Sequence, residues 1–202
     1  MRVQTSKRTI TLKIVYYGPG MSGKTTNLVK LHEAYPEGRR GSMVKLDTES
    51  ERTLFFDYFP AALGTIGGFA IKVDFFTVPG QSFYGATRRA VLQGADGVVF
   101  VADSDPRRER ANLQSKQDLL AALEAHGQPL ADVGLVYQWN KRDLPKVLPV
   151  SVLQRTLNTE GADALEAVAR DGTGVRETQE TVLRRTLEIL RTRRLVGNAH
   201  AS

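Results

Sequence analysis

The sequence predicts an α/β fold in which a mainly parallel, six-stranded sheet is flanked by helices on both faces. Short apolar runs alternate along the chain with longer segments of helical periodicity, which is typical of parallel sheets. The apolar runs are nearly uninterrupted, as expected for strands that are buried on both faces of a sheet. A glycine-rich loop joins the first such strand to the first helical segment.

The expected elements follow in chain order. Strands are predicted at 11–18, 69–78, 97–103 and 133–139, and helices at about 24–34, 86–93, 107–126, 149–157 and 175–196. Asp105 and Pro106 are suited to the N-cap and first position of the third helix, and Gly127 can end that helix in a left-handed conformation. The connection from 36 to 68 is long, so we expect part of it to form an edge strand.

Length and composition indicate one globular domain over 1–202, with flexible ends at about 1–9 and 197–202. Cysteine is absent, which excludes disulfides, thiolate catalysis, cysteine-based metal sites and attachment of lipid to cysteine. Arg2 stands where N-terminal myristoylation needs glycine, so we expect no lipid anchor. No signal peptide or membrane-spanning run is present, and we therefore expect a cytoplasmic protein.

The net charge of +6 could indicate a nucleic acid or an anionic membrane as partner. Much of this charge lies at 2–8 and at 184–195, and the second stretch has the periodicity of an amphipathic helix. A solvated basic face on a docked helix is the simpler interpretation. No nucleic-acid-binding motif is present, so we expect no nucleic acid partner.

A phosphate-binding motif, GxxxxGK[ST], is matched by GPGMSGKT at 18–25, between a strand and a helix. Gly18 and Gly23 let backbone N–H groups point at phosphate oxygens, and the helix adds its positive N-terminus. Lys24 can reach the β- and γ-phosphates, and the Thr25 hydroxyl can bind Mg²⁺. The other nucleotide contacts expected here are Gly20, Ser22 and Thr26. A plain glycine-rich turn is the alternative, which the strand–loop–helix context disfavours.

The motif NKRD at 140–143 predicts which base is bound. The Asp143 carboxylate can accept two hydrogen bonds, from N1–H and the exocyclic amine of guanine, a pair that adenine does not offer. Asn140 and Lys141 would brace the base and the loops around it. A charged turn is the alternative, but ligands bind at the carboxyl ends of strands in such sheets, which favours recognition of GTP and GDP.

Together these motifs resemble those of the Ras-like small GTPases, which have the P-loop NTPase fold. In that family a loop before the last helix contacts the base, and EAVARDGTGV at 166–175 is similar to it. The resemblance therefore implies that Val168 and Ala169 lie at the nucleotide. VFVADSDPRRER is also similar to the Arf-like branch.

A narrower resemblance is carried by IVYYGPG, ERTLFFDYFP, TVPGQSFY and GVVFVADS, which are similar to the MglA family of bacterial gliding-motility and polarity GTPases. The broader small-GTPase pattern implies that Gly80 and Thr53 sense the γ-phosphate, that Thr53 also binds Mg²⁺, and that Gln81 orients the attacking water. The MglA resemblance further implies that Arg52 stabilises the transferring phosphoryl group. The residues alone fit a surface arginine in a loop equally well.

Thr77 departs from the Ras-like pattern, because those GTPases have at this position an aspartate that helps to hold Mg²⁺. Threonine is too short and uncharged to copy a carboxylate, but it can form a hydrogen bond with a water bound to Mg²⁺. Alternatively, it is only a β-branched strand residue that does not affect the metal. Threonine is usual here in the MglA family, so the resemblance implies an intact switch.

The leading hypothesis is a GTP-hydrolysing switch that uses Mg²⁺ and is slow without an activating partner. The MglA resemblance implies a roadblock-type, MglB-like GTPase-activating partner, effector proteins, and a role in polarity or surface motility with recruitment to a cell pole. The alternative is a GTP-binding interaction subunit with negligible hydrolysis, in which Thr77 marks lost metal control. A P-loop kinase or ATPase would leave NKRD and PGQ unexplained.

Overall fold

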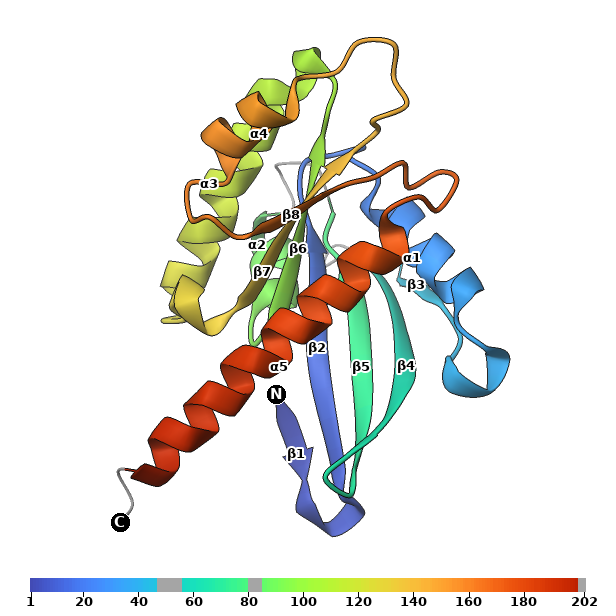
Figure 1. Ribbon diagram of the computed structural model, residues 1–202, viewed down its shortest axis with the longest axis vertical. Helices are drawn as coiled ribbons and strands as arrows, with labels where there is room; N and C mark the ends of the chain where they lie inside the picture. The colour runs from blue at the N-terminus through green and yellow to red at the C-terminus, as the bar shows by residue number, and fades with distance from the viewer. Residues whose placement is uncertain (47–55, 80–84, 200–202) are drawn as a thin grey trace.

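A computed structural model describes residues 1–46, 56–79 and 85–199 of the chain. The described residues form one sheet with the strand order β3-β4-β5-β2-β6-β7-β8, and β1 pairs with β2 outside this path. Helices α1 and α5 cover one face of the sheet, and α2, α3 and α4 cover the other (Figure 1). The loops that carry the phosphate-binding and NKRD motifs follow the carboxyl ends of β2 and β7.

The strands are β1 (Arg2–Gln4), β2 (Thr9–Tyr17), β3 (Val44–Leu46), β4 (Phe56–Ile66), β5 (Phe69–Thr77), β6 (Gly97–Asp103), β7 (Gly134–Asn140) and β8 (Asp163–Glu166). The α-helices are α1 (Lys24–Ala34), α2 (Gly85–Leu92), α3 (Glu109–Ala125), α4 (Val150–Leu157) and α5 (Val175–Ala199). Short 3₁₀ turns are η1 (Thr5–Lys7), η2 (Glu37–Arg39), η4 (Pro106–Arg108) and η5 (Leu130–Asp132).

The predicted fold class is confirmed. Strands β5, β2, β6, β7 and β8 are parallel to their neighbours in that order, whereas β4 runs antiparallel to both β3 and β5. The described sheet has eight strands, because the short strands β1 and β3 are added to the six expected. The long connection after α1 supplies β3 and β4, so it contributes two strands where a single edge strand was expected.

The beginning of the chain forms a short strand. Residues 2–4 pair with β2 in an antiparallel ladder, with Arg2 opposite Thr11. The Arg2 guanidinium lies 3.0 Å from the Asp74 carboxylate, and the amino group of Met1 pairs with Asp96. Backbone pairing and these two ion pairs hold the segment to the sheet. At the other end, α5 continues to Ala199.

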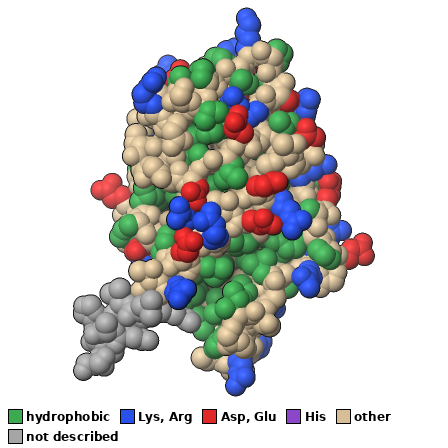
Figure 2. Space-filling view, in the orientation of Figure 1, with side chains coloured by type: hydrophobic (Ala, Val, Ile, Leu, Met, Phe, Trp, Pro, Cys, Tyr) green, Lys and Arg blue, Asp and Glu red, His purple; other side chains and the backbone are tan. Residues whose placement is uncertain are grey.

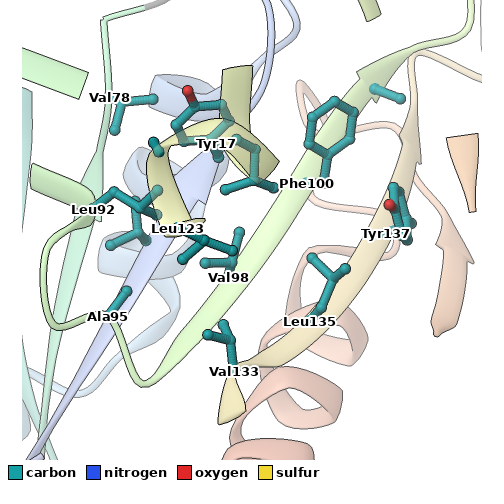
Figure 3. Packing of buried hydrophobic residues seen from close by; sticks show 14 of the residues in the cluster. Tyr17, Val78, Leu92, Ala95, Val98, Phe100, Leu123, Val133, Leu135 and Tyr137 are labelled. Atoms are coloured by element: carbon teal, nitrogen blue, oxygen red, sulfur yellow. The ribbon is translucent and has the colours of Figure 1, made fainter. Parts of the chain in front are cut away.

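Each face of the sheet has its own hydrophobic core. The core beneath α2, α3 and α4 includes Phe100 and Tyr137, and Figure 3 shows their side chains among the other labelled residues of this cluster. The core beneath α1 and α5 includes Leu28, Phe59 and Val182. All residues of β6 and β7 are buried, as the uninterrupted apolar runs predict for central strands.

The basic C-terminal helix packs on the sheet through buried residues such as Val182. Figure 2 shows basic and acidic side chains interspersed over this face of the molecule. Arg184 and Arg185 both pair with Asp163, and Arg193 pairs with Asp132. Part of the positive charge is therefore offset within the chain. Within the described ranges, no helix combines the length and the hydrophobicity needed to cross a membrane.

Candidate nucleotide-binding site

The phosphate-binding loop connects β2 to α1 and requires glycine at two positions. The φ angles of Gly18 and Gly23 are 144° and 102°, in the region that side chains disfavour. A Cβ on Gly18 would lie 2.3 Å from the Val101 carbonyl oxygen, and one on Gly23 would lie 2.2 Å from Nδ2 of Asn140. Both glycines therefore provide the loop conformation and the space for neighbouring strands to approach it.

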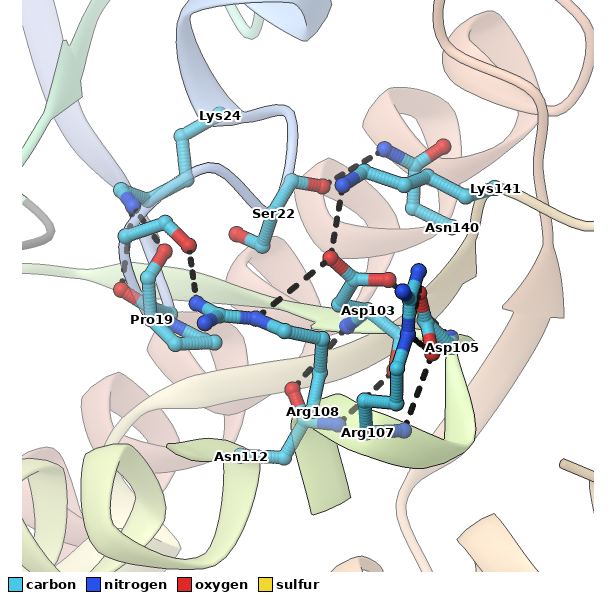
Figure 4. A network of polar contacts seen from close by, with 12 residues as sticks. Pro19, Ser22, Lys24, Asp103, Asp105, Arg107, Arg108, Asn112, Asn140 and Lys141 are labelled. Carbon is cyan, nitrogen blue, oxygen red and sulfur yellow. Dashed lines mark hydrogen bonds and ion pairs between the residues drawn. The ribbon is translucent and has the colours of Figure 1, made fainter. Parts of the chain in front are cut away.

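Lys24 opens helix α1 and folds back over the loop. Its Nζ donates hydrogen bonds to the carbonyl oxygens of Gly18 (3.0 Å) and Pro19 (2.7 Å), as Figure 4 shows. Burial, together with the nearby charges of Arg88 and Arg108, lowers the pKa of Lys24 to about 7. No carboxylate pairs with this amine in the described parts of the chain. A phosphate group would supply the missing counter-ion.

The remaining loop residues also fit a phosphate. Ser22 is fully buried, and its hydroxyl has no hydrogen-bond partner within the described residues. Gly20 is half-buried, and Thr26 is half-buried in the first turn of α1. The N-terminus of α1 adds unpaired N–H groups and the positive end of the helix dipole. The loop therefore combines a buried cation, an unpartnered hydroxyl and a helix N-terminus, which together favour an anion.

Two residues that the sequence analysis missed brace the outer side of this loop. Asp103, which ends β6, is buried and accepts a 2.6 Å hydrogen bond from Nζ of Lys141. Arg108, in η4, donates to the carbonyl oxygen of Gly20 at 2.6 Å, and its Nε lies 3.9 Å from the Asp103 carboxylate. A carboxylate that ends a fully buried strand was the available signal in the sequence.

Asn140 joins the phosphate-binding loop to the expected base-binding loop. Its Nδ2 donates to the Ser22 carbonyl oxygen at 2.7 Å, and its Oδ1 accepts from the backbone N–H of Ala169 at 2.9 Å. Only 2% of Asn140 is exposed, so both hydrogen bonds are protected from water. Asn140 thus brings together three segments that the sequence analysis assigned separately to the nucleotide.

Asp143, the carboxylate expected to select guanine, lies beside the same loop. Oδ2 of Asp143 is 3.1 Å from a guanidinium nitrogen of Arg170, which places Asp143 next to the segment that contains Ala169. Val168 donates its backbone N–H to Thr173 and so closes this loop. Lys141 has a positive φ of 66°, which is uncommon for a residue with a side chain and marks the sharp turn after β7.

On the other side of the phosphate-binding loop, two threonines meet at one carboxylate. The Thr25 hydroxyl donates to Oδ2 of Asp57 at 2.6 Å, and the Thr77 hydroxyl donates to the same atom at 3.0 Å. The backbone N–H of Asp57 donates to Oγ1 of Thr77 at 2.9 Å. Asp57 was not among the predicted site residues, although Thr25 and Thr77 were.

Hydroxyl and carboxylate oxygens are the ligand types that Mg²⁺ prefers, so this corner fits the expected ion. The described residues contain no group of three or more His, Cys, Asp or Glu side chains that could hold a metal. A Mg²⁺ ion that is bound mainly by phosphate oxygens, waters and one or two protein groups needs no such cluster. The predicted residues Arg52, Thr53, Gly80 and Gln81 lie outside the described residues, and their roles stay predictions.

Comparison with known proteins gives the family. No protein-family model matches the chain. The chain is 43% identical over 189 residues to the "Mutual gliding-motility protein MglA" of Myxococcus xanthus (strain DK1622). The alignment covers 94% of this chain and 97% of that protein. The chain therefore belongs to the MglA family of bacterial Ras-like small GTPases.

Proposed function

We propose that the protein is a molecular switch that binds GTP together with Mg²⁺ and hydrolyses it to GDP and phosphate. The observation that carries the proposal is the pair of buried hydrogen bonds through which Asn140 joins Ser22 to Ala169. These bonds join the loop before Lys24 to the segment after Asp143, which supports a phosphate site and a base site at the same edge of the sheet. Membership of the MglA family supports the Ras-like class of switch.

In this proposal, the described residues do the binding. The ammonium group of Lys24 and the N–H groups at the start of α1 oppose the charge of the phosphates. A bound phosphate also raises the pKa of Lys24, because an adjacent anion stabilises the charged amine. Asp143 accepts the two N–H donors of guanine. Asn140 fixes the position of the phosphate-binding loop relative to the base-binding loop.

Hydrolysis is assigned to residues outside the described ranges. Gln81 orients the attacking water, and Arg52 stabilises the negative charge on the transferring phosphoryl group from within the same chain. Thr53 and Gly80 respond to the γ-phosphate, so hydrolysis changes their contacts. When bound, Mg²⁺ neutralises part of the phosphate charge. The support for these roles is the resemblance of ERT and PGQ to the family pattern.

The cellular role follows from the family. We propose a cytoplasmic regulator of polarity or surface motility that is recruited to a cell pole through other proteins. Its partners would be effectors and a roadblock-type, MglB-like activating protein, and no nucleic acid. The support is the similarity to a protein named for gliding motility. We further propose that 1–202 acts as one domain.

One observation favours a second candidate, a GTP-binding interaction subunit with negligible hydrolysis. Thr77 replaces a carboxylate that other Ras-like GTPases use near Mg²⁺. Single-turnover hydrolysis of GTP, with and without Mg²⁺, separates the two candidates. The switch predicts phosphate release that depends on Mg²⁺ and accelerates with the activating partner. Tight GTP binding without hydrolysis under either condition would support the interaction subunit instead.

A further inference from the structure

Strand β4 brings a carboxylate to the position where β5 lacks one. The two strands are antiparallel, and Tyr58 pairs with Phe76, so Asp57 and Thr77 are the next residues on each strand. The hydrogen bonds between Asp57 and Thr77 show that they face each other. A residue twenty positions earlier in the chain therefore lies against the threonine that replaces the usual aspartate.

The pleat of the strands explains which way Asp57 points. Side chains alternate between the faces of a sheet, so Asp57 shares a face with Phe59, and Thr77 shares a face with Phe75. Both phenylalanines belong to the core beneath α1 and α5. Asp57 therefore projects toward the N-terminus of α1, where the Thr25 hydroxyl donates to its carboxylate.

Asp57 forms no ion pair within the described residues, although the more distant charge of Lys24 interacts with it. The residue is half-buried, and no lysine or arginine pairs with it among the residues that the structure describes. Its two hydroxyl donors, Thr25 and Thr77, both bind Oδ2, and Oδ1 has no partner within those residues. A partly desolvated carboxylate without a cation is unfavourable, and its one accepting oxygen faces the hydroxyl expected to bind Mg²⁺.

We propose that Asp57 provides the carboxylate of the Mg²⁺ site in place of the residue at position 77, and that Thr77 positions it. The inference rests on the proposed function, because Mg²⁺ arrives with the nucleotide. Asp57 would act on the ion directly or through one of its waters, and the Thr77 hydroxyl would fix the carboxylate rotamer. In this arrangement the carboxylate comes from β4 instead of from position 77 on β5, and the metal site is retained.

The test is the Mg²⁺ dependence of GDP release, which needs no hydrolysis. Each protein is loaded with a fluorescent GDP analogue, and its release rate is measured over a series of free Mg²⁺ concentrations. We expect Asp57→Asn to raise the half-saturating Mg²⁺ concentration at least about tenfold, which is the usual effect of losing a group that supports a metal. With Mg²⁺ chelated, Asp57→Asn and the parent should release the analogue at equal rates.

Two further variants make the result specific. Asp74→Asn is the matched control, because Asp74 is another carboxylate of this strand pair but binds Arg2 and Tyr58. It should keep the parental dependence on Mg²⁺. The double variant Asp57→Asn/Thr77→Asp returns a carboxylate to the position that other Ras-like GTPases use. It should restore much of the Mg²⁺ sensitivity.

The outcomes separate this inference from the proposed function. If the parent retains GDP only with Mg²⁺ and Asp57→Asn behaves like the parent, the role of Asp57 is refuted while the switch proposal stands. If Asp74→Asn shows the same shift as Asp57→Asn, the effect is general to the strand pair and the role of Asp57 is again refuted. A parent that does not bind the GDP analogue at all contradicts the proposed function itself.

Discussion

The two sides of the site are built differently. The base side is joined by Asn140, which is 2% exposed and bonds to the backbone of both Ser22 and Ala169. The metal side depends on side-chain hydroxyls that meet at Asp57, and Thr25 among them is exposed. Buried bonds to backbone fix a geometry more firmly than hydrogen bonds between side chains that water can reach.

This difference suits a switch. In the proposed function, a rigid base side would keep the protein bound to guanine nucleotides, whereas a metal side built on side chains would respond to the γ-phosphate. The two sides share the phosphate-binding loop, which supplies Ser22 to one and Thr25 to the other. Changes on the base side should therefore affect affinity, and changes on the metal side should affect Mg²⁺ dependence or the chemical step.

The largest effect is expected at Arg52. Arg52→Ala should lower the rate of GTP hydrolysis by ~10³-fold with little change in affinity, because an arginine that acts in cis stabilises only the transition state. Gln81→Leu should lower the same rate, and the double variant should lose less than the product of the single losses. Phosphate release under single-turnover conditions measures the hydrolysis rate of all three variants. Arg39→Ala is the control, because Arg39 is an exposed arginine in η2, and it should keep the parental rate.

Adding the activating partner sharpens this prediction. If Arg52 acts in cis, saturating partner should leave Arg52→Ala far below the parental rate. Rescue to the parental rate would show that the partner supplies its own arginine. In that case Arg52 would have no role in catalysis. Of the two residues, only Gln81 would then support a chemical step on the metal side.

The next largest effect is expected on the base side. Asp143→Asn should weaken GTP binding by ~10²-fold or more, because two hydrogen bonds to a charged acceptor are lost. Preference should move toward xanthine nucleotides, whose 2-oxo group accepts from an amide. Competition binding with GTP, XTP and ATP measures this shift. Asp171→Asn, an exposed aspartate in the neighbouring loop, should bind as the parent does; a parental GTP preference in Asp143→Asn would remove the base-recognition claim.

A smaller effect on affinity is expected at Asn140, with a larger one on stability. Asn140→Ala leaves the Ser22 carbonyl and the Ala169 N–H unpaired, which should cost about 2–5 kcal/mol of unfolding free energy. Asn158→Ala is a close match, because Asn158 is also buried and also makes two hydrogen bonds to backbone, both with Ala162.

Both variants should therefore be less stable by denaturant titration, but only Asn140→Ala should weaken GDP binding, by ~10-fold. Equal loss of GDP affinity in the two variants would mean that Asn140 contributes general stability rather than alignment of the site.

The smallest effect is a pH dependence from Lys24. Burial lowers its pKa to about 7, and a bound phosphate raises it, so GDP binding at pH 8 should be accompanied by proton uptake. The contribution of Lys24 to affinity should be complete below about pH 7 and should fall by up to ~10-fold per pH unit above it. Calorimetry in buffers of different ionisation enthalpy measures the uptake. Lys24→Arg should abolish it, because arginine stays protonated, and a parent without uptake at pH 8 would contradict the lowered pKa.

The base side could be predicted from sequence because its motifs directly follow buried strands. A run such as 133–139 fixes where β7 ends, so the position of Asn140 follows from local pattern. The metal side could not be predicted in the same way. Asp57 meets Thr77 only through the register of an antiparallel pair, and register depends on the whole sheet.

The attachment of residues 2–4 to β2 was missed for a similar reason. Its contacts, from Arg2 to Asp74 and from Met1 to Asp96, join residues more than seventy positions apart. Local pattern thus predicts central strands and the motifs that follow them. Edge strands and long-range ion pairs depend on tertiary pairing, which leaves no local signal.

The nucleotide that co-purifies with the protein tests the central claim most directly. The protein is purified in buffer with Mg²⁺ and denatured, and the released small molecules are separated by chromatography against guanine and adenine standards. A switch with Lys24 and Asp143 in one site predicts bound GDP or GTP in near-stoichiometric amount. Adenine nucleotide in its place, or a protein that carries none and binds none on addition of GDP and Mg²⁺, would contradict the account.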